Sequence, residues 1–150
     1  MKIAPEKRTV TIRIESNLED VALVGAVARM LASRLSLAEA DIGDIELAVS
    51  EAVNNAILHA YRDEPGHLVE IKFTQQEDEL TIDVCDQGRP MTNFEPTAFG
   101  YDSADPLRLP ERGMGLFIIG EIMDEAVYRS SRAKNVLTMT RRIKPRRVAP

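Results

Sequence analysis

Hydrophobic and polar residues alternate in four segments of the chain, which are predicted to form β-strands. These segments are Thr9–Ile14, Leu68–Phe73, Leu80–Cys85 and Val136–Ile143, and a shorter strand is expected at Ala126–Ser130. Because the apolar side chains fall on one face of each strand, one face of the sheet should be buried and the other should meet water. Strands of this kind favour antiparallel pairing over a parallel sheet that is covered on both faces.

Other segments follow the helical period. A first helix is expected to begin after Ser16, because Glu19 follows three residues later in a capping-box pattern. A second should run from about Ala38 to Tyr61, and a third, shorter helix fits Gly115–Met123. The apolar stripe of the first helix comprises Val21, Val24, Ala28, Leu31 and Leu35, and that of the second comprises Ile45, Ala48, Val49, Ala52, Val53, Ala56 and Ala60. We therefore predict an α+β two-layer sandwich, in which helices pack on one face of a mixed, mostly antiparallel sheet.

The composition is that of an ordinary globular domain. The 150 residues are 44% hydrophobic and 29% charged, and we expect one domain over residues 8–143 with flexible ends at 1–7 and 144–150. No apolar run reaches the roughly 20 residues of a membrane span, and the N-terminus has no apolar signal-peptide core. The formal net charge of −5 argues against general nucleic-acid binding. The single Cys85, expected to have a packing role, excludes an internal disulfide and a Cys-rich metal site. A cytoplasmic protein with no direct nucleic-acid or membrane partner is the simplest interpretation.

Two polar stretches connect the predicted elements. Gln75–Glu79 is expected to join two strands as a hairpin connection. The stretch between Gln87 and Glu111 is rich in Pro, Gly, Asp and Ser and is long for a connection inside a compact domain. Loops of this length are usually functional lids or disordered segments.

The second predicted helix carries polar residues at the border of its apolar stripe. Glu51, Asn55 and His59 fall on one edge, one helical turn apart, and Leu47 and Leu58 flank them. Partial burial would raise the pKa of a carboxyl group there, which suits a general base, and an amide oxygen is an acceptable ligand for Mg2+. The alternative is a polar helix edge made of ordinary surface residues and a packed histidine.

A second candidate lies at the end of a predicted strand. Asp86 leaves the strand beside Gly88, so its carboxylate could enter a crevice and accept a hydrogen bond from an exocyclic amine, while the glycine allows backbone or ligand to approach closely. The alternative is a simple turn, since Asp and Gly are frequent turn residues.

The third candidate is the stretch Arg112–Leu116, at the end of the long loop and the start of the third helix. Gly113 and Gly115, with Met114 between them, would expose backbone N–H groups at a helix N-terminus, which attracts anions. The guanidinium of Arg112 is suited to phosphate oxygens. The alternative is a flexible hinge with a capping turn.

Three stretches containing these candidates, SEAVNNAILHAY, DVCDQGRPM and ERGMGLFIIGEIMD, resemble the N, G1 and G2 boxes of the GHKL ATP-binding superfamily. That superfamily includes gyrase, MutL and the ATP-binding domains of histidine kinases. The short, stand-alone form is similar to the bacterial anti-sigma factor serine/threonine protein kinases. The resemblance covers roughly Arg8 to Ile143, and three boxes in the right order are a much more specific signal than any one of them.

The resemblance implies a role for each candidate in binding ATP with Mg2+. Glu51 matches the N-box acid, the general base that activates the attacking hydroxyl, and Asn55 matches the amide that holds Mg2+. Asp86 matches the G1 acid that accepts from the adenine amino group, with Gly88 allowing close approach. The stretch Arg112–Leu116, with the G2 glycines Gly113 and Gly115, matches the segment around the phosphates.

The chain also departs from the superfamily pattern at two places. Pro90 stands where the wider superfamily often has a second G1 glycine, and a proline there is common in the anti-sigma branch. Many members carry a threonine near adenine on the last strand, and Thr138 is the candidate match here.

The resemblance implies an ATP- and Mg2+-dependent protein serine/threonine kinase that acts as an anti-sigma factor. Such a protein binds a sigma factor, phosphorylates a small STAS-type antagonist and forms a homodimer. One alternative is a kinase or nucleotide-dependent switch of the same fold that regulates a different partner, such as a phosphatase or a signalling complex. Another is a non-catalytic ATP-binding interaction module, against which Glu51 argues, since nucleotide binding alone needs no general base.

Overall fold

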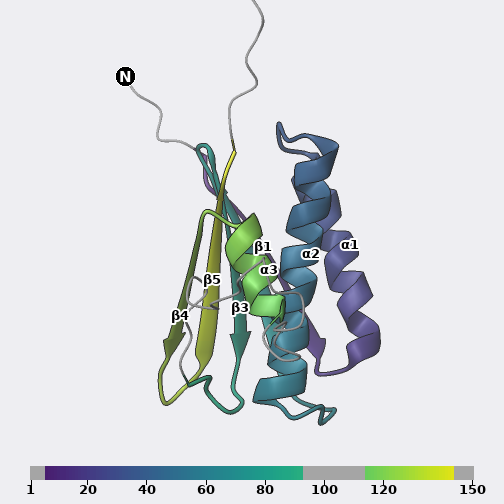
Figure 1. The fold of residues 1–150 in the computed structure, drawn as a ribbon, viewed down its shortest axis with the longest axis vertical. Helices are drawn as coiled ribbons and strands as arrows, with labels where there is room; N and C mark the ends of the chain where they lie inside the picture. Colours follow the sequence, from purple (N-terminus) through teal and green to yellow (C-terminus); the bar gives the residue numbers. More distant parts are fainter. Residues whose placement is uncertain (1–5, 93–113, 144–150) are drawn as a thin grey trace, which may run out of the picture.

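The computed structural model describes residues 6–92 and 114–143, in which helices cover one face of a five-stranded sheet (Figure 1). The strands are β1 (Arg8–Glu15), β2 (Leu68–Gln76), β3 (Glu79–Asp86), β4 (Glu125–Ser130) and β5 (Asn135–Arg142). The α-helices are α1 (Val21–Ser33), α2 (Glu39–Asn55) and α3 (Met114–Ile122). A 3₁₀ turn, η1 (Leu18–Asp20), precedes α1, and a π-helical turn, η2 (Ala56–Ala60), follows α2. The predicted α+β two-layer sandwich is confirmed.

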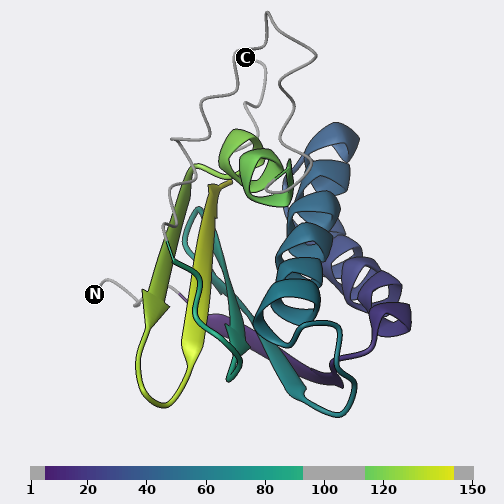
Figure 2. The ribbon, with the colours of Figure 1, turned by 60° about the horizontal axis from the view of Figure 1, so that its bottom comes forward.

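The strands are arranged in the order β1-β2-β3-β5-β4. Each of the four pairings between neighbours is antiparallel, so the mostly antiparallel sheet is confirmed, and no parallel pairing occurs within the described ranges. The hairpin between β2 and β3 is tighter than predicted, because their ladder extends to the pair Gln76 and Glu79 and leaves only two residues to turn. Figure 2 shows α3 beside the β4–β5 edge of the sheet, next to α2.

The start of the first helix differs from the predicted capping box. The side chain of Asn17, not that of Ser16, accepts a hydrogen bond from the backbone N–H of Glu19 (3.1 Å). Ser16 is buried, and its hydroxyl donates to the carbonyl of Glu64 (2.6 Å) and accepts from the N–H of His67 (3.0 Å). The prediction for Ser16 was wrong because its hydroxyl binds the connection between α2 and β2, which is distant in sequence.

The second helix is not α-helical to its predicted end. After Asn55 the chain continues as the π-helical turn η2, closed by a hydrogen bond from the N–H of Tyr61 to the carbonyl of Ala56 (3.1 Å). Arg62 and Asp63 then adopt positive φ angles of 52° and 59°, and the helix ends. A π-helical turn closes over five residues rather than four, so side chains beyond Asn55 leave the line that a regular helix predicts.

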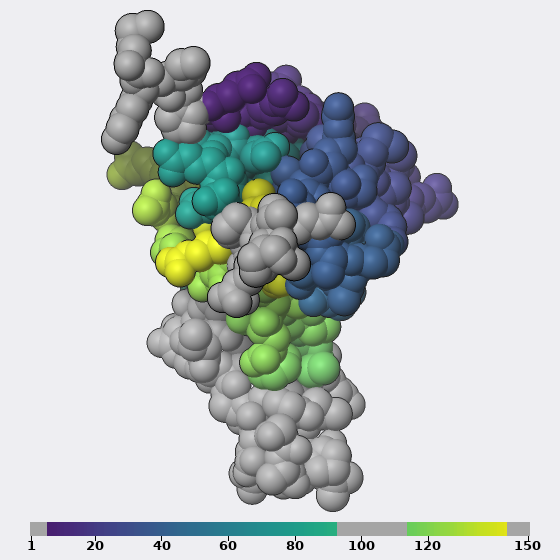
Figure 3. All heavy atoms as spheres, turned by 90° about the horizontal axis from the view of Figure 1, so that it is seen from above, coloured from purple at the N-terminus to yellow at the C-terminus, as the bar shows by residue number. Residues whose placement is uncertain are grey.

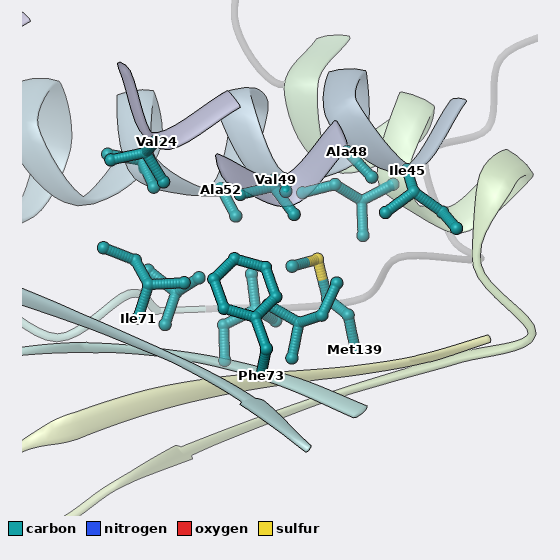
Figure 4. Packing of buried hydrophobic residues seen from close by; sticks show 14 of the residues in the cluster. Val24, Ile45, Ala48, Val49, Ala52, Ile71, Phe73 and Met139 are labelled. Atoms are coloured by element: carbon teal, nitrogen blue, oxygen red, sulfur yellow. The ribbon is translucent and has the colours of Figure 1, made fainter. Parts of the chain in front are cut away.

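The hydrophobic core lies between α1 and α2 on one side and the inner face of the sheet on the other. In the view from above, the atoms of α2 (blue) lie to one side and those of the strands (teal to yellow) to the other (Figure 3). The side chains that meet between the layers include Val24, Ile45, Ala48, Val49 and Ala52 from the helices and Ile71, Phe73 and Met139 from the strands (Figure 4). All of these side chains are less than 5% exposed, as the predicted stripes require.

The packing loosens at the β1 edge of the sheet. Val10 faces inward as predicted but is 40% exposed. Leu31 and Leu35 of the predicted stripe are only half-buried, and Leu35 lies beyond the end of α1. These residues line a groove of about 570 Å3 together with Phe73 and Leu80. An edge strand has a neighbour on one side only, so its side chains are less fully covered.

Candidate functional site

Two tyrosine hydroxyls hold the turn that follows β3. The N–H of Gln87 donates to the hydroxyl of Tyr61 (2.7 Å), and the N–H of Met91 donates to the hydroxyl of Tyr128 (2.8 Å). The Tyr61 hydroxyl in turn donates to the carbonyl of Leu68 (2.6 Å). Burial raises the pKa of both phenols, so both remain protonated donors and acceptors at neutral pH. Both ends of the turn are thereby fixed to residues that are distant in sequence: Tyr61, directly after η2, and Tyr128 in β4.

The middle of the turn lies against the end of η2. The N–H of Gly88 donates to Asp86 Oδ1 (2.9 Å), and the N–H of Arg89 donates to the carbonyl of Ala60 (2.9 Å). A Cβ atom on Gly88 would lie 2.4 Å from that carbonyl oxygen, so only glycine fits. The backbone of Ala60 is therefore what approaches Gly88 in the structure.

Asp86 is a buried carboxylate, with 8% of its surface exposed. Its Oδ1 accepts hydrogen bonds from Gly88 and from the side-chain amide of Asn135 (2.8 Å). Burial raises the pKa of the Asp86 carboxyl group, and the hydrogen bonds from Asn135 and Gly88 oppose that rise. The simple turn of the alternative interpretation is also present, since Gly88 bonds back to Asp86, and the same carboxylate lines a cavity described below.

Asn135 was missed by the sequence analysis, which proposed Thr138 for the last strand. The Thr138 hydroxyl donates to Asp83 Oδ1 (2.6 Å), and Asp83 lies three residues before Asp86 on β3, hence on the opposite face. The Thr138 match is therefore wrong. Asn135 opens β5, where a polar residue ordinarily indicates a turn, so only the pairing of β3 with β5 reveals its position beside Asp86.

On α2, Glu51 and Asn55 lie next to the first turn of α3. A Cβ atom on Gly115 would lie 2.7 Å from Glu51 Oε2 and 3.5 Å from both terminal atoms of the Asn55 amide. The amide nitrogen of Asn55 is buried and has no hydrogen-bond partner among the described residues. An unpartnered buried N–H donor, next to a glycine at a helix N-terminus, suits an acceptor such as a phosphate oxygen. The other end of the same amide, Oδ1, is an oxygen of the kind that Mg2+ accepts as a ligand.

His59 does not lie beside Glu51 and Asn55 as the helical spacing predicted. His59 and Leu58 lie in η2, where the π-helical turn moves them off the edge that Glu51 and Asn55 share, and both are exposed. Leu47 is also exposed, so neither Leu47 nor Leu58 belongs to the buried core. Because His59 is exposed, the alternative of a packed histidine at this position is also wrong.

The third candidate is only partly described. Gly115 and Leu116 lie in the first turn of α3, where Leu116 is half-buried and packs on the core, and Met114 is exposed. Arg112 and Gly113 lie outside the described residues, as does most of the long loop that precedes them.

A small cavity joins the first two candidates. Its volume is about 20 Å3, and its lining includes Asn55 from α2, Asp86 from β3 and Tyr128 from β4. Since Gly115 of α3 meets Glu51 and Asn55 directly, residues from all three predicted motifs converge on one part of the molecule. The groove of about 570 Å3 near β1 contains none of them.

Cys85 lies on β3 beside Asp86, half-buried. Burial raises the pKa of its thiol, which keeps the sulfur protonated and unreactive at neutral pH.

The described ranges contain no helix that is long and apolar enough to cross a membrane. They also contain no cluster of three or more His, Cys, Asp or Glu side chains that could hold a metal ion.

Residues 14–141 match the family model described as the histidine kinase-like ATPase domain. The chain belongs to this family. It is 33% identical over 142 residues to the serine-protein kinase RsbW of Bacillus cereus (strain Q1), an alignment that covers 93% of this chain and 88% of the relative. The serine-protein kinase RsbW of Bacillus thuringiensis (strain Al Hakam) is 32% identical with the same coverage. The resemblance to the anti-sigma factor serine/threonine kinases is thereby confirmed.

The fold of the family is also seen in a solved structure, that of the RsbU and RsbW domains of a protein from Mycobacterium tuberculosis. It matches with a TM-score of 0.66 and 20% sequence identity, over 95% of this chain. The chain spans about a third of that longer protein (35%), and the similarity shows the shared fold.

Proposed function

We propose that this protein is an ATP- and Mg2+-dependent protein serine/threonine kinase that acts as an anti-sigma factor. The observation that carries the proposal is the meeting of three distant parts of the chain. Asn55 and Asp86 line one cavity, and Gly115 lies against Glu51 and Asn55. The similarity to serine-protein kinases over nearly the whole chain supports transfer to a hydroxyl group. One domain, residues 8–143, would carry the complete site.

Asp86 is proposed to bind the adenine base. An ionised carboxylate only accepts hydrogen bonds, so it would favour the amino group of adenine. The cavity beside it, about 20 Å3, has room for about one water molecule. A purine ring is much larger, so we propose that residues around this cavity, among them Arg89 and Met91, move apart when the nucleotide binds.

Asn55 and the start of α3 are proposed to bind the phosphates. The side-chain oxygen of Asn55 would hold Mg2+, and its unpartnered nitrogen would donate to a phosphate oxygen. The metal, when bound, neutralises charge that develops on the phosphates. Backbone N–H groups at the N-terminus of α3, with Gly113 and Gly115, would contact phosphate oxygens. Arg112 is proposed to contact the terminal phosphate, because the family pattern has a basic residue at this place. Met114 and Leu116 would complete the phosphate-binding segment.

Glu51 is proposed as the general base. Its Oε2 faces the first turn of α3, where the phosphates would be bound. Glu51 would accept the proton of the substrate hydroxyl as that oxygen attacks the terminal phosphorus, and ADP would leave. Correct placement of the two reactants supplies most of the rate enhancement in such transfers.

The protein substrate is proposed to be a small STAS-type antagonist, and the second partner a sigma factor. Phosphorylation adds a charge of about −1.5 to −2, which would weaken the contact between the antagonist and the acidic kinase, whose net charge is −5. The kinase would then be free to bind the sigma factor. We expect a homodimer that acts in the cytoplasm, where sigma factors function.

A thermal-unfolding assay with ATP and Mg2+ tests nucleotide binding. A ligand at a hundred times its Kd stabilises the folded state by about 2.7 kcal/mol, which should raise the Tm by roughly 5–10 °C for a domain of this size. No shift at saturating ATP would contradict the proposal.

Glu51→Gln separates binding from transfer. The variant should retain the ATP-induced shift and lose phosphotransfer to the antagonist by about 10²–10⁴-fold, the usual contribution of a general base. Glu46→Gln is the matched control, because Glu46 lies on the same helix but pairs with Arg29 (3.1 Å). If Glu51→Gln transferred phosphate as fast as the control, the assignment of the base would be wrong.

The partners are tested by purifying the tagged protein from its native cell. A sigma factor together with a small protein that the kinase phosphorylates would support the proposal. Recovery of only a phosphatase or a scaffold would favour the alternative in which the same fold regulates another partner.

A further inference from the structure

Asn135 is a buried polar residue at the start of β5, opposite Asp86 in the β3–β5 ladder. Only 2% of it is exposed. Its Nδ2 donates to Asp86 Oδ1 (2.8 Å) and to the carbonyl of Gly88 (3.0 Å), and its Oδ1 accepts from the hydroxyl of Ser130 (2.7 Å). Because both partners of Nδ2 are acceptors, the amide has only one orientation that satisfies them.

The hydrogen bonds of Asn135 leave the two oxygens of Asp86 in different situations. Oδ1 accepts from both Asn135 and the N–H of Gly88 (2.9 Å). Oδ2 accepts no hydrogen bond from any residue in the described ranges, and Asp86 is one of the residues that line the small cavity. One oxygen is thus held by the protein, and the other is available to a ligand.

We propose that Asn135 is a positioning residue for base recognition: it fixes Asp86 through Oδ1 and the carbonyl of Gly88, and so presents Oδ2 to the exocyclic amino group of adenine. This inference rests on the proposed function, in which Asp86 binds the base. It adds that the preference for adenine over guanine depends on a residue that does not touch the nucleotide.

The chemistry of the two bases explains why this arrangement selects one of them. The amino group of adenine donates to a carboxylate oxygen, whereas guanine has a carbonyl oxygen at the same ring position, and two acceptors repel each other. The selection holds only while the carboxylate is ionised and correctly oriented. Burial favours the protonated form, which would donate to a carbonyl, and the hydrogen bond from Asn135 favours the ionised form.

Asn135→Leu tests the inference, since leucine has nearly the shape of asparagine and no hydrogen-bonding group. Kd values for ATP and GTP, each with Mg2+, are measured by titration calorimetry on the full chain. The Kd for ATP should rise about tenfold, the usual effect of losing one hydrogen bond to a charged group, and that for GTP by at most about twofold. A general loosening of the site would raise the Kd values for ATP and GTP by the same factor.

Thr138→Val is the matched control. Thr138 also donates to a carboxylate across the β3–β5 ladder, Asp83 (2.6 Å), but on the opposite face of the sheet. The affinities of the Thr138→Val variant for ATP and for GTP should stay within about twofold of the wild-type values. If Asn135→Leu does not fold, Asn135→Thr replaces it, because threonine suits a strand and retains one hydroxyl donor. Its preference for ATP over GTP should then be weaker than that of wild type.

The outcomes separate this inference from the proposed function. A wild-type chain that bound no ATP would overturn both. A wild-type chain that bound ATP, with an Asn135 variant of unchanged ATP preference or with equal losses for ATP and GTP, would overturn the role of Asn135 alone.

Discussion

Replacing Gly88 by alanine perturbs the contact between the turn after β3 and the end of η2. The added methyl carbon would lie 2.4 Å from the carbonyl oxygen of Ala60 and 2.6 Å from its carbonyl carbon. Both atoms belong to the backbone, so no side-chain rotation relieves the clash. The turn has to move by about 1 Å to reach ordinary van der Waals contact.

The energetic cost of Gly88→Ala follows from that movement. The hydrogen bond from the N–H of Arg89 to Ala60 is now 2.9 Å long, and a shift of about 1 Å breaks it. Overpacking costs about 1–3 kcal/mol and the lost hydrogen bond about 1 kcal/mol. We therefore expect the free energy of unfolding to fall by about 2–4 kcal/mol and the Tm by roughly 5–15 °C. ATP binding should weaken as well, because the shift displaces Asp86.

Urea unfolding of Gly88→Ala measures the cost, with Gly43→Ala as a matched control. Gly43 lies inside α2, where a Cβ atom meets only an Arg29 nitrogen at 4.0 Å. The same substitution there should stabilise the protein by about 0.5–1 kcal/mol, because alanine is the better helix former. If Gly88→Ala unfolded within about 0.5 kcal/mol of wild type and bound ATP normally, the close approach to Ala60 would not hold in solution.

Gly115→Ala would place a methyl group 2.7 Å from Glu51 Oε2, and because a side chain can yield, it should cost about 1 kcal/mol of stability or less while slowing phosphotransfer about tenfold or more in a single-turnover assay. Burial raises the pKa of Asp86 above its unfolded value, so ionisation destabilises the fold as pH rises through that interval. Asp86→Asn should therefore raise the Tm at pH 7, by a margin that shrinks toward pH 4, and weaken ATP binding; a lower Tm at pH 7 would contradict this. Tyr61→Phe removes the acceptor of the Gln87 N–H and should cost about 1–3 kcal/mol in urea unfolding, whereas an unchanged urea midpoint would mean that water replaces the hydroxyl.

The strands and the apolar stripes of α1 and α2 were predictable because their pattern is local. Alternation places one side chain in two toward the core, and the 3.6-residue period places one stripe of α2 there, so burial alone selects both patterns. In the segment Ala56–Ala60 the apolar pattern does not distinguish an α-helix from a π-helical turn. Its composition is compatible with a regular helix, and the π-helical turn was not predicted from the apolar pattern.

The capping of α1 was mispredicted for a related reason. Ser16 and Asn17 are both good N-cap residues, and a local rule cannot choose between them. The choice depends on Glu64 and His67, which are distant in sequence and take the Ser16 hydroxyl. A polar side chain that is buried in the folded protein bonds wherever the tertiary structure places a partner.

By itself the sequence determined the two-layer architecture, the family, and the residue types of the candidate site, Glu51, Asn55, Asp86 and Gly115, because periodicity and short motifs are local properties of the chain. Only the tertiary structure decided which of these side chains meet. The pairing of β3 with β5 placed Asn135 beside Asp86 and turned Thr138 away, and the contact with Ala60 explained Gly88. These relations join residues far apart in sequence, and they exist only when packing and hydrogen bonding bring the elements together.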